Sequence, residues 1–320
     1  MKQEMISYIE KHKEDLINLN KFLYDNPEKS YEEYKAYKYI TDLLEKHDFE
    51  VSKDFLELKT SFYATKGTSH PKICFLCEYD AIENEGHITG HNLLTSTSVA
   101  AALALGAIIE KTGGSVTIIG CPGEYLGGTK SVMVKQDVFK DIDIAMLAHP
   151  DIVTCESGTS SAIIPLSLKF IGNKGLSFLN KNSYTSLDGI LLTLNILNIV
   201  EKGFPDDVEV TSILSNGGST PLLLPLEAET KFYIRAKEMD VARVVEEKIK
   251  EIGIYVSKLI RIQSIFSLYE PENEELNTNR SLNRLFSHNL KETGIINIGA
   301  PRDINSGLSL GIVSKSIPSI

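Results

Sequence analysis

The sequence predicts an α/β protein with a doubly wound parallel sheet and a second, smaller α+β layer inserted into it. Three short apolar runs, each bounded by turn residues, predict buried strands at Ile73–Cys77, Val116–Cys121 and Ile142–Leu147. Helix-patterned segments at Leu93–Lys111 and Thr129–Phe139 separate these runs. Alternation of strand and helix is typical of parallel sheets with right-handed crossovers, so we expect all three strands to run in one direction.

The first fifty residues predict two helices that precede this sheet. Apolar residues recur at helical spacing up to Asn26-Pro27, which ends the first helix. Ser30 followed by Glu33 has the spacing of a capping box, so we expect the second helix to begin there.

The later part of the chain predicts the inserted layer. Three segments in which apolar and polar residues alternate predict strands: AIIPLSLKF, AETKFYIRA and YVSKLIRIQSIFSL. Helices are expected at Leu187–Val200 and Val241–Ile252. Such strand and helix repeats form an α+β layer on an antiparallel sheet. We therefore predict a main α/β domain in residues 1–159, the insertion in residues 160–268, and a return to the main domain in residues 269–320 that includes the helix SLNRLFSHNLKETG.

Composition indicates a globular protein and argues against two classes of partner. Of the 320 residues, 42% are hydrophobic and 24% are charged, which are ordinary values for folded domains. The formal net charge of −10 disfavours nucleic acid, because phosphate contacts need clustered Lys and Arg. No apolar run approaches the ~20 residues of a membrane span, and the N-terminus lacks a signal peptide's apolar stretch. We expect neither a nucleic-acid nor a membrane partner.

The four cysteines predict thiols rather than disulfides. Cys74, Cys77, Cys121 and Cys155 are too few and too scattered for a disulfide scaffold. Cys74 and Cys77 form a C-x-x-C inside a predicted strand, where alternation directs them to opposite faces of the sheet. We therefore expect buried thiols in a reducing, cytoplasmic compartment.

Polar side chains follow each of the three predicted parallel strands. Open parallel sheets bind ligands beyond the carboxyl ends of their strands, so we expect these side chains to share one edge. Carboxylates and imidazoles together are typical of divalent-metal hydrolases, in which a free Glu takes a proton from bound water. The residues are Glu78 and Asp80 after the first strand, Glu124 after the second, His149 after the third, and His87 and His91 in the connection that follows Asp80.

Each of these residues also has a structural interpretation. Asp80 has the position of a turn cap, and Glu124 that of a solvated loop carboxylate. A pair of loop histidines such as His87 and His91 is more often structural than metal-binding. His149 before a proline is equally a hydrogen-bonding residue at a strand end. Only their convergence on one edge favours the functional interpretation.

Five segments, in chain order, resemble motifs of peptidase family M20, and most closely its subfamily D, which includes aminoacylase-like and aminobenzoyl-glutamate-utilisation enzymes. CEYDAIENEGHITGHN resembles EYDALPG-GHACGHN, IIGCPGEYLGGTK resembles GTPAEE-GGGK, and IDIAMLAHP resembles DAALMVHP. NGGSTPLLLPLEAETKFYIRA resembles the family's GG-A-NIIPD-AE-YYTRA, and LGIVSKSIPSI resembles MGNVSHVVPSIH. The resemblance implies a zinc-peptidase-like α/β domain with a mixed sheet, and an inserted ferredoxin-like lid that also mediates dimerisation. The two domains would close around a small amide or peptide substrate.

The resemblance also implies a site for two divalent ions, zinc or manganese, with departures at its ligands. His91 and His149 stand at the positions of two of the family's histidine ligands, and Glu124 stands at the position of the family's general base. Thr89 stands at the family's cysteine ligand, and Tyr125 stands at its glutamate ligand.

Further positions are kept or changed outside the ligand set. Asp80 stands at the position of the family residue that orients a metal ligand, and Arg235 stands at the position of the substrate-binding arginine in the Y-x-R-A strand. Leu176 replaces the lid histidine, and Leu222 replaces the asparagine of N-I-I-P. The family's last histidine ligand would fall just after Ile320, and we expect an uncovered sheet edge or helix-docking surface there.

These departures predict impaired hydrolysis. Thr offers only a neutral hydroxyl and Tyr only a phenol with a pKa of ~10, and both hold a dication poorly at neutral pH. One alternative is an active metal-dependent aminoacylase or dipeptidase that recruits His87, Asp303 or a residue of a partner chain. Two others are a non-catalytic protein that binds a ligand or an active paralogue, and a decayed product without selected activity.

Overall fold

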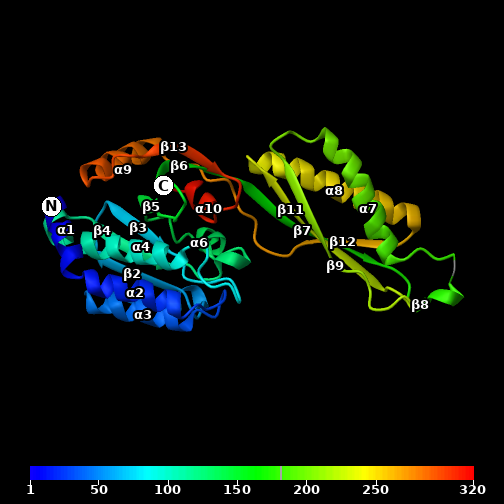
Figure 1. Cartoon of the computed structure of the whole chain (residues 1–320), viewed down its shortest axis with the longest axis horizontal. Coiled ribbons are helices and arrows are strands. Elements are labelled where there is room, and N and C mark those ends of the chain that lie inside the picture. Colours follow the sequence, from blue (N-terminus) through cyan, green and yellow to red (C-terminus); the bar gives the residue numbers. More distant parts are fainter. Residues whose placement is uncertain (181) are drawn as a thin grey trace. The chain divides into compact units, whose positions relative to one another are not determined.

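The structure, a computed structural model, describes residues 1–180 and 182–320 and divides into two compact units (Figure 1). The first unit comprises residues 1–159, 276–303 and 309–320, and the second comprises residues 160–275 and 304–308. Both units combine helices with a sheet, which confirms the α/β fold class. No helix in the described part of the chain has the length and hydropathy needed to cross a membrane.

A five-stranded sheet in the order β1-β2-β4-β3-β5 forms the centre of the first unit. β3 pairs in parallel with both β4 and β5, so the three predicted strands do run in one direction. β1 and β2 are antiparallel additions that the sequence did not predict, because neither contains a continuous apolar run. The strands are β1 (Glu50–Lys53), β2 (Phe62–Gly67), β3 (Lys72–Cys77), β4 (Ser115–Gly120) and β5 (Ile144–Met146).

Helices cover the sheet of the first unit. Three of them precede it rather than the predicted two, because the first helical segment breaks at His12. The buried core includes Leu19, Leu23, Ile40 and Leu44, and each such side chain stabilises the fold by about 1.5–3 kcal/mol. The helices are α1 (Lys2–Lys11), α2 (Lys13–Asp25), α3 (Tyr34–Lys46), α4 (His91–Gly106), α5 (Ile109–Thr112), α6 (Lys130–Lys135), α9 (Arg280–Glu292) and α10 (Leu310–Ser314).

The predicted capping box at Ser30 is wrong. α3 begins after Glu33, and neither polar side chain caps it. The Glu28 carboxylate instead accepts hydrogen bonds from the first amides of α3. Ser30 Oγ donates to Asp80 Oδ2 at 2.7 Å, and Glu33 Oε1 accepts from the Gly123 amide at 2.8 Å. Both side chains therefore serve the loops at the carboxyl ends of the strands, which local spacing cannot reveal.

The second unit is built on a four-stranded antiparallel sheet in the order β12-β7-β11-β9. Two helices pack against it, and their buried side chains form one hydrophobic core with those of the sheet. The strand predicted to begin at Tyr255 is wrong in its first half, because the helix continues to Ile260. The elements are β7 (Ala162–Ile171), α7 (Ser186–Val200), β9 (Glu209–Asn216), β11 (Glu227–Ala236), α8 (Met239–Ile260) and β12 (Gln263–Leu268).

Short strand pairs complete the fold. β6 (Cys155–Ser160) pairs with β13 (Gly299–Ile304), and β8 (Gly175–Leu176) pairs with β10 (Leu223–Leu224). Ile320 lies beside β5, where its carbonyl accepts from the Leu147 amide and its own amide donates to the Ala145 carbonyl. This edge of β5 is therefore paired with the segment that ends at Ile320.

The cysteines are unpaired thiols, as predicted. Cys74, Cys77 and Cys121 are buried, and burial raises the pKa of the Cys121 thiol to about 12. Thiols with so little thiolate at neutral pH are chemically inert.

Gly120, the last residue of β4, tests how tightly the strand ends are packed beneath the site. A Cβ there would lie 2.3 Å from the Phe62 ring and 2.6 Å from Tyr79 Oη. Gly120→Ala should therefore lower the free energy of unfolding by about 1–3 kcal/mol, measured by urea denaturation. Gly203→Ala is the control, because a Cβ at Gly203 would meet nothing within 4 Å. Equal stability of the two variants would contradict this packing.

Candidate functional site

The centre of the candidate site is the ammonium group of Lys130, whose side chain is completely buried. Its Nζ donates to Glu78 Oε1 at 2.6 Å, to Glu124 Oε2 at 2.9 Å and to Ser309 Oγ at 2.7 Å. An ammonium has three N–H donors, and here each has an acceptor. Because a buried charge is costly unless it is paired and hydrogen-bonded, this arrangement explains how the lysine is tolerated.

The parallel strands and two glycine turns bring these groups together. Glu78 directly follows β3, and Glu124 follows β4 after a turn at Gly123, where φ is +77°. A second turn, with Gly128 at φ +69°, returns the chain so that α6 begins at Lys130 beside Glu124. A Cβ at Gly128 would lie 2.6 Å from Glu124 Oε2, so the close approach requires glycine.

His91 is held from both sides by carboxylates. Its Nδ1 lies 2.9 Å from Asp80 Oδ1, and its Nε2 lies 3.4 Å from Glu78 Oε2. Burial alone would lower the pKa of His91, but the hydrogen bond to Asp80 and the charge of Glu78 raise it above its usual value. Burial would raise the pKa of Asp80, but its hydrogen bond with His91 holds it below its usual value. Each residue therefore favours the charged form of the other.

The two carboxylates on Lys130 differ in their affinity for a proton. Burial raises the pKa of Glu124, and the neighbouring Glu78 raises it further. For Glu78 the effect of burial is outweighed by Lys130 and His91, which lower its pKa. Glu124 therefore binds a proton more readily than Glu78 does. A buried carboxyl group with a raised pKa has the property required of a general acid or base.

Thr89 and Tyr125, which the resemblance placed at two ligand positions, contact each other. Thr89 Oγ1 and Tyr125 Oη share a hydrogen bond. The Tyr125 ring stacks on His91, with ring centroids 4.7 Å apart and an interplanar angle of 19°. Burial raises the pKa of Tyr125 to about 12, so its phenol is not an anionic ligand at neutral pH.

The donor set fits one metal ion and does not fit two. One ligand atom from each of Glu78, His91 and His149 lies within 4.8 Å of the others, and two imidazoles with a carboxylate suit a single Zn²⁺. Asp80 binds Nδ1 of His91 and leaves its Nε2 for an ion. Thr89 and Tyr125 bond to each other and offer neutral hydroxyls, which are poor ligands for a second ion.

The other predicted residues are not members of this three-residue metal-binding group. Arg235 lies in the second unit, where its Nη1 donates to Thr211 Oγ1 at 3.1 Å. Asp303 is exposed and is not among the three metal-binding side chains. His87 is not among them either; it is buried, and burial lowers its pKa to about 4.

Sequence reasoning assigned no role to Glu78 and did not single out Lys130. Glu78 precedes Asp80 by two residues and follows the same strand, which was a usable signal. Lys130 matches the lysine of the GGGK motif, which was also a usable signal, although lysines are rarely buried.

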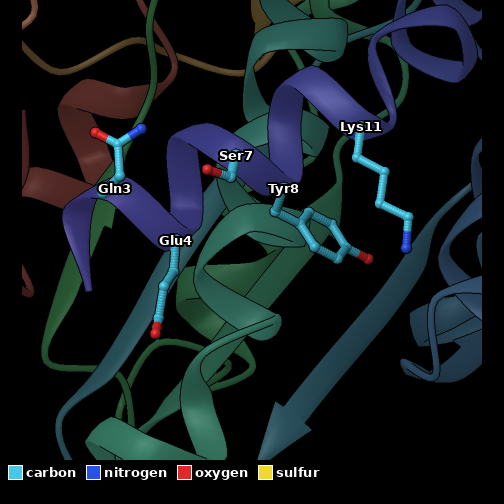
Figure 2. Close-up of a pocket in the computed structure, with 5 residues that line it drawn as sticks. All are labelled: Gln3, Glu4, Ser7, Tyr8 and Lys11. Carbon is cyan, nitrogen blue, oxygen red and sulfur yellow. The ribbon is translucent and has the colours of Figure 1, made fainter.

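A separate hollow of about 330 Å³ lies along α1 (Figure 2). None of the candidate residues lines it, so we do not regard it as the catalytic pocket. It is lined by Gln3, Glu4, Ser7, Tyr8 and Lys11.

Comparison with known proteins identifies relatives along much of the chain. It is 30% identical over 256 residues to one of the subunits of p-aminobenzoyl-glutamate hydrolase from Escherichia coli K12, a match that covers 72% of this chain and 53% of the relative. It is 28% identical over 272 residues to Xaa-Arg dipeptidase of Mus musculus, covering 78% of this chain and 62% of the relative. The chain thus spans little more than half the length of these relatives. No family model matches the sequence.

The fold is shared with solved structures. A dinuclear metal-binding peptidase of the M20 family from Bacillus subtilis superimposes with a TM-score of 0.69 at 17% identity, covering 95% of this chain and 86% of that one. This similarity confirms the predicted fold.

Lys130→Met should test the central contacts of the site. Removing one partner of a buried ion pair leaves an uncompensated charge and typically costs about 3–5 kcal/mol of unfolding free energy. Adding Glu124→Gln should restore part of that loss, which urea denaturation of the single and double variants would measure. Lys111→Met removes an exposed lysine paired with Glu4 and should leave stability unchanged. A Lys130→Met variant as stable as the parent would refute the buried pairing.

The lowered pKa of Asp80 predicts how the stability of the fold depends on pH. Because its pKa is lowered in the folded state, its stabilising contribution is present above the unfolded pKa of about 3.9 and is lost as the pH falls through the folded value. The difference in unfolding free energy between the parent and Asp80→Asn should therefore be constant near neutral pH and shrink in acid. Urea denaturation at several pH values would measure it, and a difference that grows in acid would contradict the assignment.

Proposed function

Because this chain is homologous to the M20 peptidases and amidohydrolases, we propose that it is a catalytically impaired member of that group that binds a small amide or peptide. The observation that supports this proposal most directly is the hydrogen bond between Thr89 and Tyr125, the residues that stand at two ligand positions of the resemblance. Neither side chain offers the anionic donor that a metallohydrolase uses to hold a dication.

Hydrolysis by two ions needs ligands that are replaced here. Thr89 and Tyr125 stand where the family carries a thiolate and a carboxylate, and they are bonded to each other. Without an ion, water keeps a pKa of ~15.7 instead of ~7, so Glu124 has no activated nucleophile to deprotonate. We therefore propose that amide hydrolysis is slower by orders of magnitude than in a two-ion enzyme.

The proposed ligand carries an amide bond and a carboxylate. The names of the two relatives denote p-aminobenzoyl-glutamate and dipeptides that end in arginine as their substrates. Both contain a free amino-acid carboxylate, which a guanidinium can bind with two parallel hydrogen bonds. We propose that Arg235, whose side chain is 23% exposed, supplies that contact.

A second candidate function is hydrolysis at a single ion. The grouping of Glu78, His91 and His149 favours it, since three protein ligands are the usual number at a catalytic zinc. A zinc or manganese ion bound there would polarise a substrate carbonyl. Glu124, with its raised pKa, would be the proton acceptor.

We further propose that the second unit mediates self-association and that the protein works in the cytoplasm. β9 is an edge strand, and its side chains Ile213 and Leu214 are 63% and 47% exposed. An exposed apolar edge favours pairing with another sheet edge. The unpaired cysteines fit a reducing compartment.

Activity and binding assays distinguish the two candidates. Protein supplied with Zn²⁺ or Mn²⁺ would be assayed with N-acyl amino acids, p-aminobenzoyl-glutamate and Xaa-Arg dipeptides, beside Glu124→Gln and His149→Ala. We expect no turnover above the blank. Turnover that both substitutions reduce by orders of magnitude would establish the single-ion hydrolase instead.

The same compounds should raise the unfolding temperature of the protein. Arg235→Lys should reduce that shift, because a lysine cannot form the paired hydrogen bonds of a guanidinium. Arg261→Lys, at an exposed arginine of the same unit, is the matched control and should keep the shift. If none of the compounds stabilises the protein, the proposed ligand class is wrong.

A further inference from the structure

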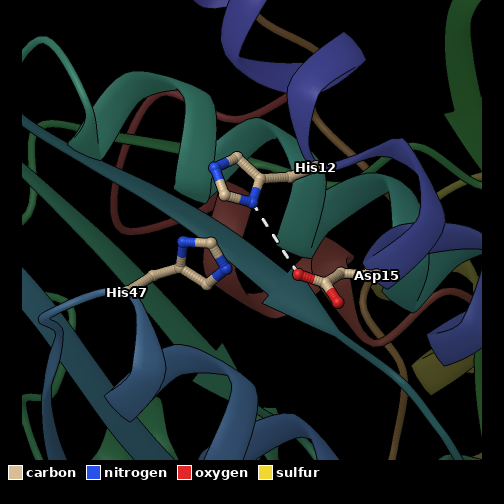
Figure 3. A group of neighbouring side chains, drawn as sticks. All are labelled: His12, Asp15 and His47. Atoms are coloured by element: carbon tan, nitrogen blue, oxygen red, sulfur yellow. Dashed lines mark ion pairs between the residues drawn. The ribbon is translucent and has the colours of Figure 1, made fainter.

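A second group of metal-binding side chains lies outside the site described above, where three helices meet. His12 lies between α1 and α2, Asp15 is in the first turn of α2, and His47 follows the last residue of α3. One ligand atom of each lies within 4.8 Å of the others. Figure 3 shows the two rings and the carboxylate turned toward one another. We propose that these three side chains bind a Zn²⁺ ion.

His47 contributes a nitrogen that has no partner among the described residues. The residue is 6% exposed, and its buried Nε2 makes no hydrogen bond. Its Nδ1 lies 2.6 Å from Tyr8 Oη, and in the tautomer whose Nδ1–H donates to the tyrosine, Nε2 keeps a lone pair for an ion. A hydrogen bond at the second nitrogen is the usual support of a metal-binding histidine. Burial and the neighbouring His12 lower the pKa of His47, which favours this neutral form.

His12 and Asp15 already have nearly the spacing of zinc ligands. His12 Nδ1 lies 3.7 Å from Asp15 Oδ2. Zinc bonds of about 2.0–2.1 Å in a tetrahedron place neighbouring ligands roughly 3.4 Å apart, so only small side-chain rotations are needed. The side chains are 22% and 34% exposed, which gives an ion access from solvent and leaves room for a water as the fourth ligand.

Lys46 is the present partner of the Asp15 carboxylate. Its Nζ lies 2.9 Å from Asp15 Oδ2, and its side chain is 61% exposed. The hydrogen bond from Lys46 lowers the pKa of Asp15, so the carboxylate is ionised and ready to bind a cation. Because exposed ion pairs contribute little to stability, the lysine can move into solvent when an ion binds.

The donor chemistry selects zinc over the common alkaline-earth ions. Two imidazole nitrogens and one carboxylate oxygen match the ligands of Zn²⁺, whereas Ca²⁺ and Mg²⁺ prefer oxygen donors alone. The ion would join the start of α2 to the end of α3, so its role would be structural.

Zinc titration of the metal-free full chain, produced without a histidine tag, would test the proposal. His149→Ala removes one ligand of the other group, and competition with a chromophoric chelator would then report the remaining site. We expect this variant to bind one equivalent of Zn²⁺ tightly, and the His12→Ala/His149→Ala double variant to lose it. Zn²⁺ should raise the unfolding temperature of the first variant and not that of the second.

Two further variants separate a built site from adventitious binding. Tyr8→Phe, in the His149→Ala background, removes the group that orients His47 and should weaken zinc binding by about 10–100-fold. His288→Ala in the same background removes an exposed histidine that pairs with Glu292, and should leave zinc binding unchanged. Equal zinc binding in the His149→Ala and His12→Ala/His149→Ala variants, or no tight binding in either, would overturn the proposal.

Discussion

The contact on which the site depends is the pairing of the buried Lys130 ammonium with Glu78 and Glu124. Three chain segments contribute to it, one after β3, one after β4 and one at the start of α6. In a medium of low dielectric constant, none of these charges would be tolerable alone. Each segment is therefore held in place by the others, and the chemistry of the site cannot be separated from the stability of its loops.

Residues far from the strands reinforce the same loops. The Glu33 carboxylate accepts hydrogen bonds from the Gly123 amide and from Thr60 Oγ1, and so ties the turn before Glu124 to the segment that precedes α3. Ser30 does the same for Asp80. The helical layer thus fixes the direction of the carboxylates as well as covering the sheet. Polar residues that imitate a helix cap in sequence are used here to shape the site.

The sequence predicts the parallel strands and the edge at which polar residues gather, because apolar runs between turn residues leave few other folds. It does not predict the partners within that edge. Lysine is rarely buried, so only the position of Glu78 in three dimensions reveals Lys130 as a central residue. Alternation after Tyr255 likewise imitates a strand, yet Val256 and Ile260 continue the buried face of α8. Where a short segment fits both the helical period of 3.6 residues and the strand period of 2, tertiary packing decides which structure forms.

Charge balance explains why the cluster suits one ion at most. Glu78, Asp80 and Glu124 supply three negative charges when ionised, and Lys130 supplies one positive charge. With no ion, burial and the charge of Glu78 raise the pKa of Glu124, and the neighbouring carboxylates raise that of His91 against the effect of burial, so the excess of negative charge favours binding of protons. With one dication and a neutral, ligating His91, the cluster is neutral. A second dication would add two uncompensated positive charges, for which Thr89 and Tyr125 supply no anionic ligand. The ammonium already offsets one of the three carboxylates, so the remaining negative charge balances one dication and leaves none for a second.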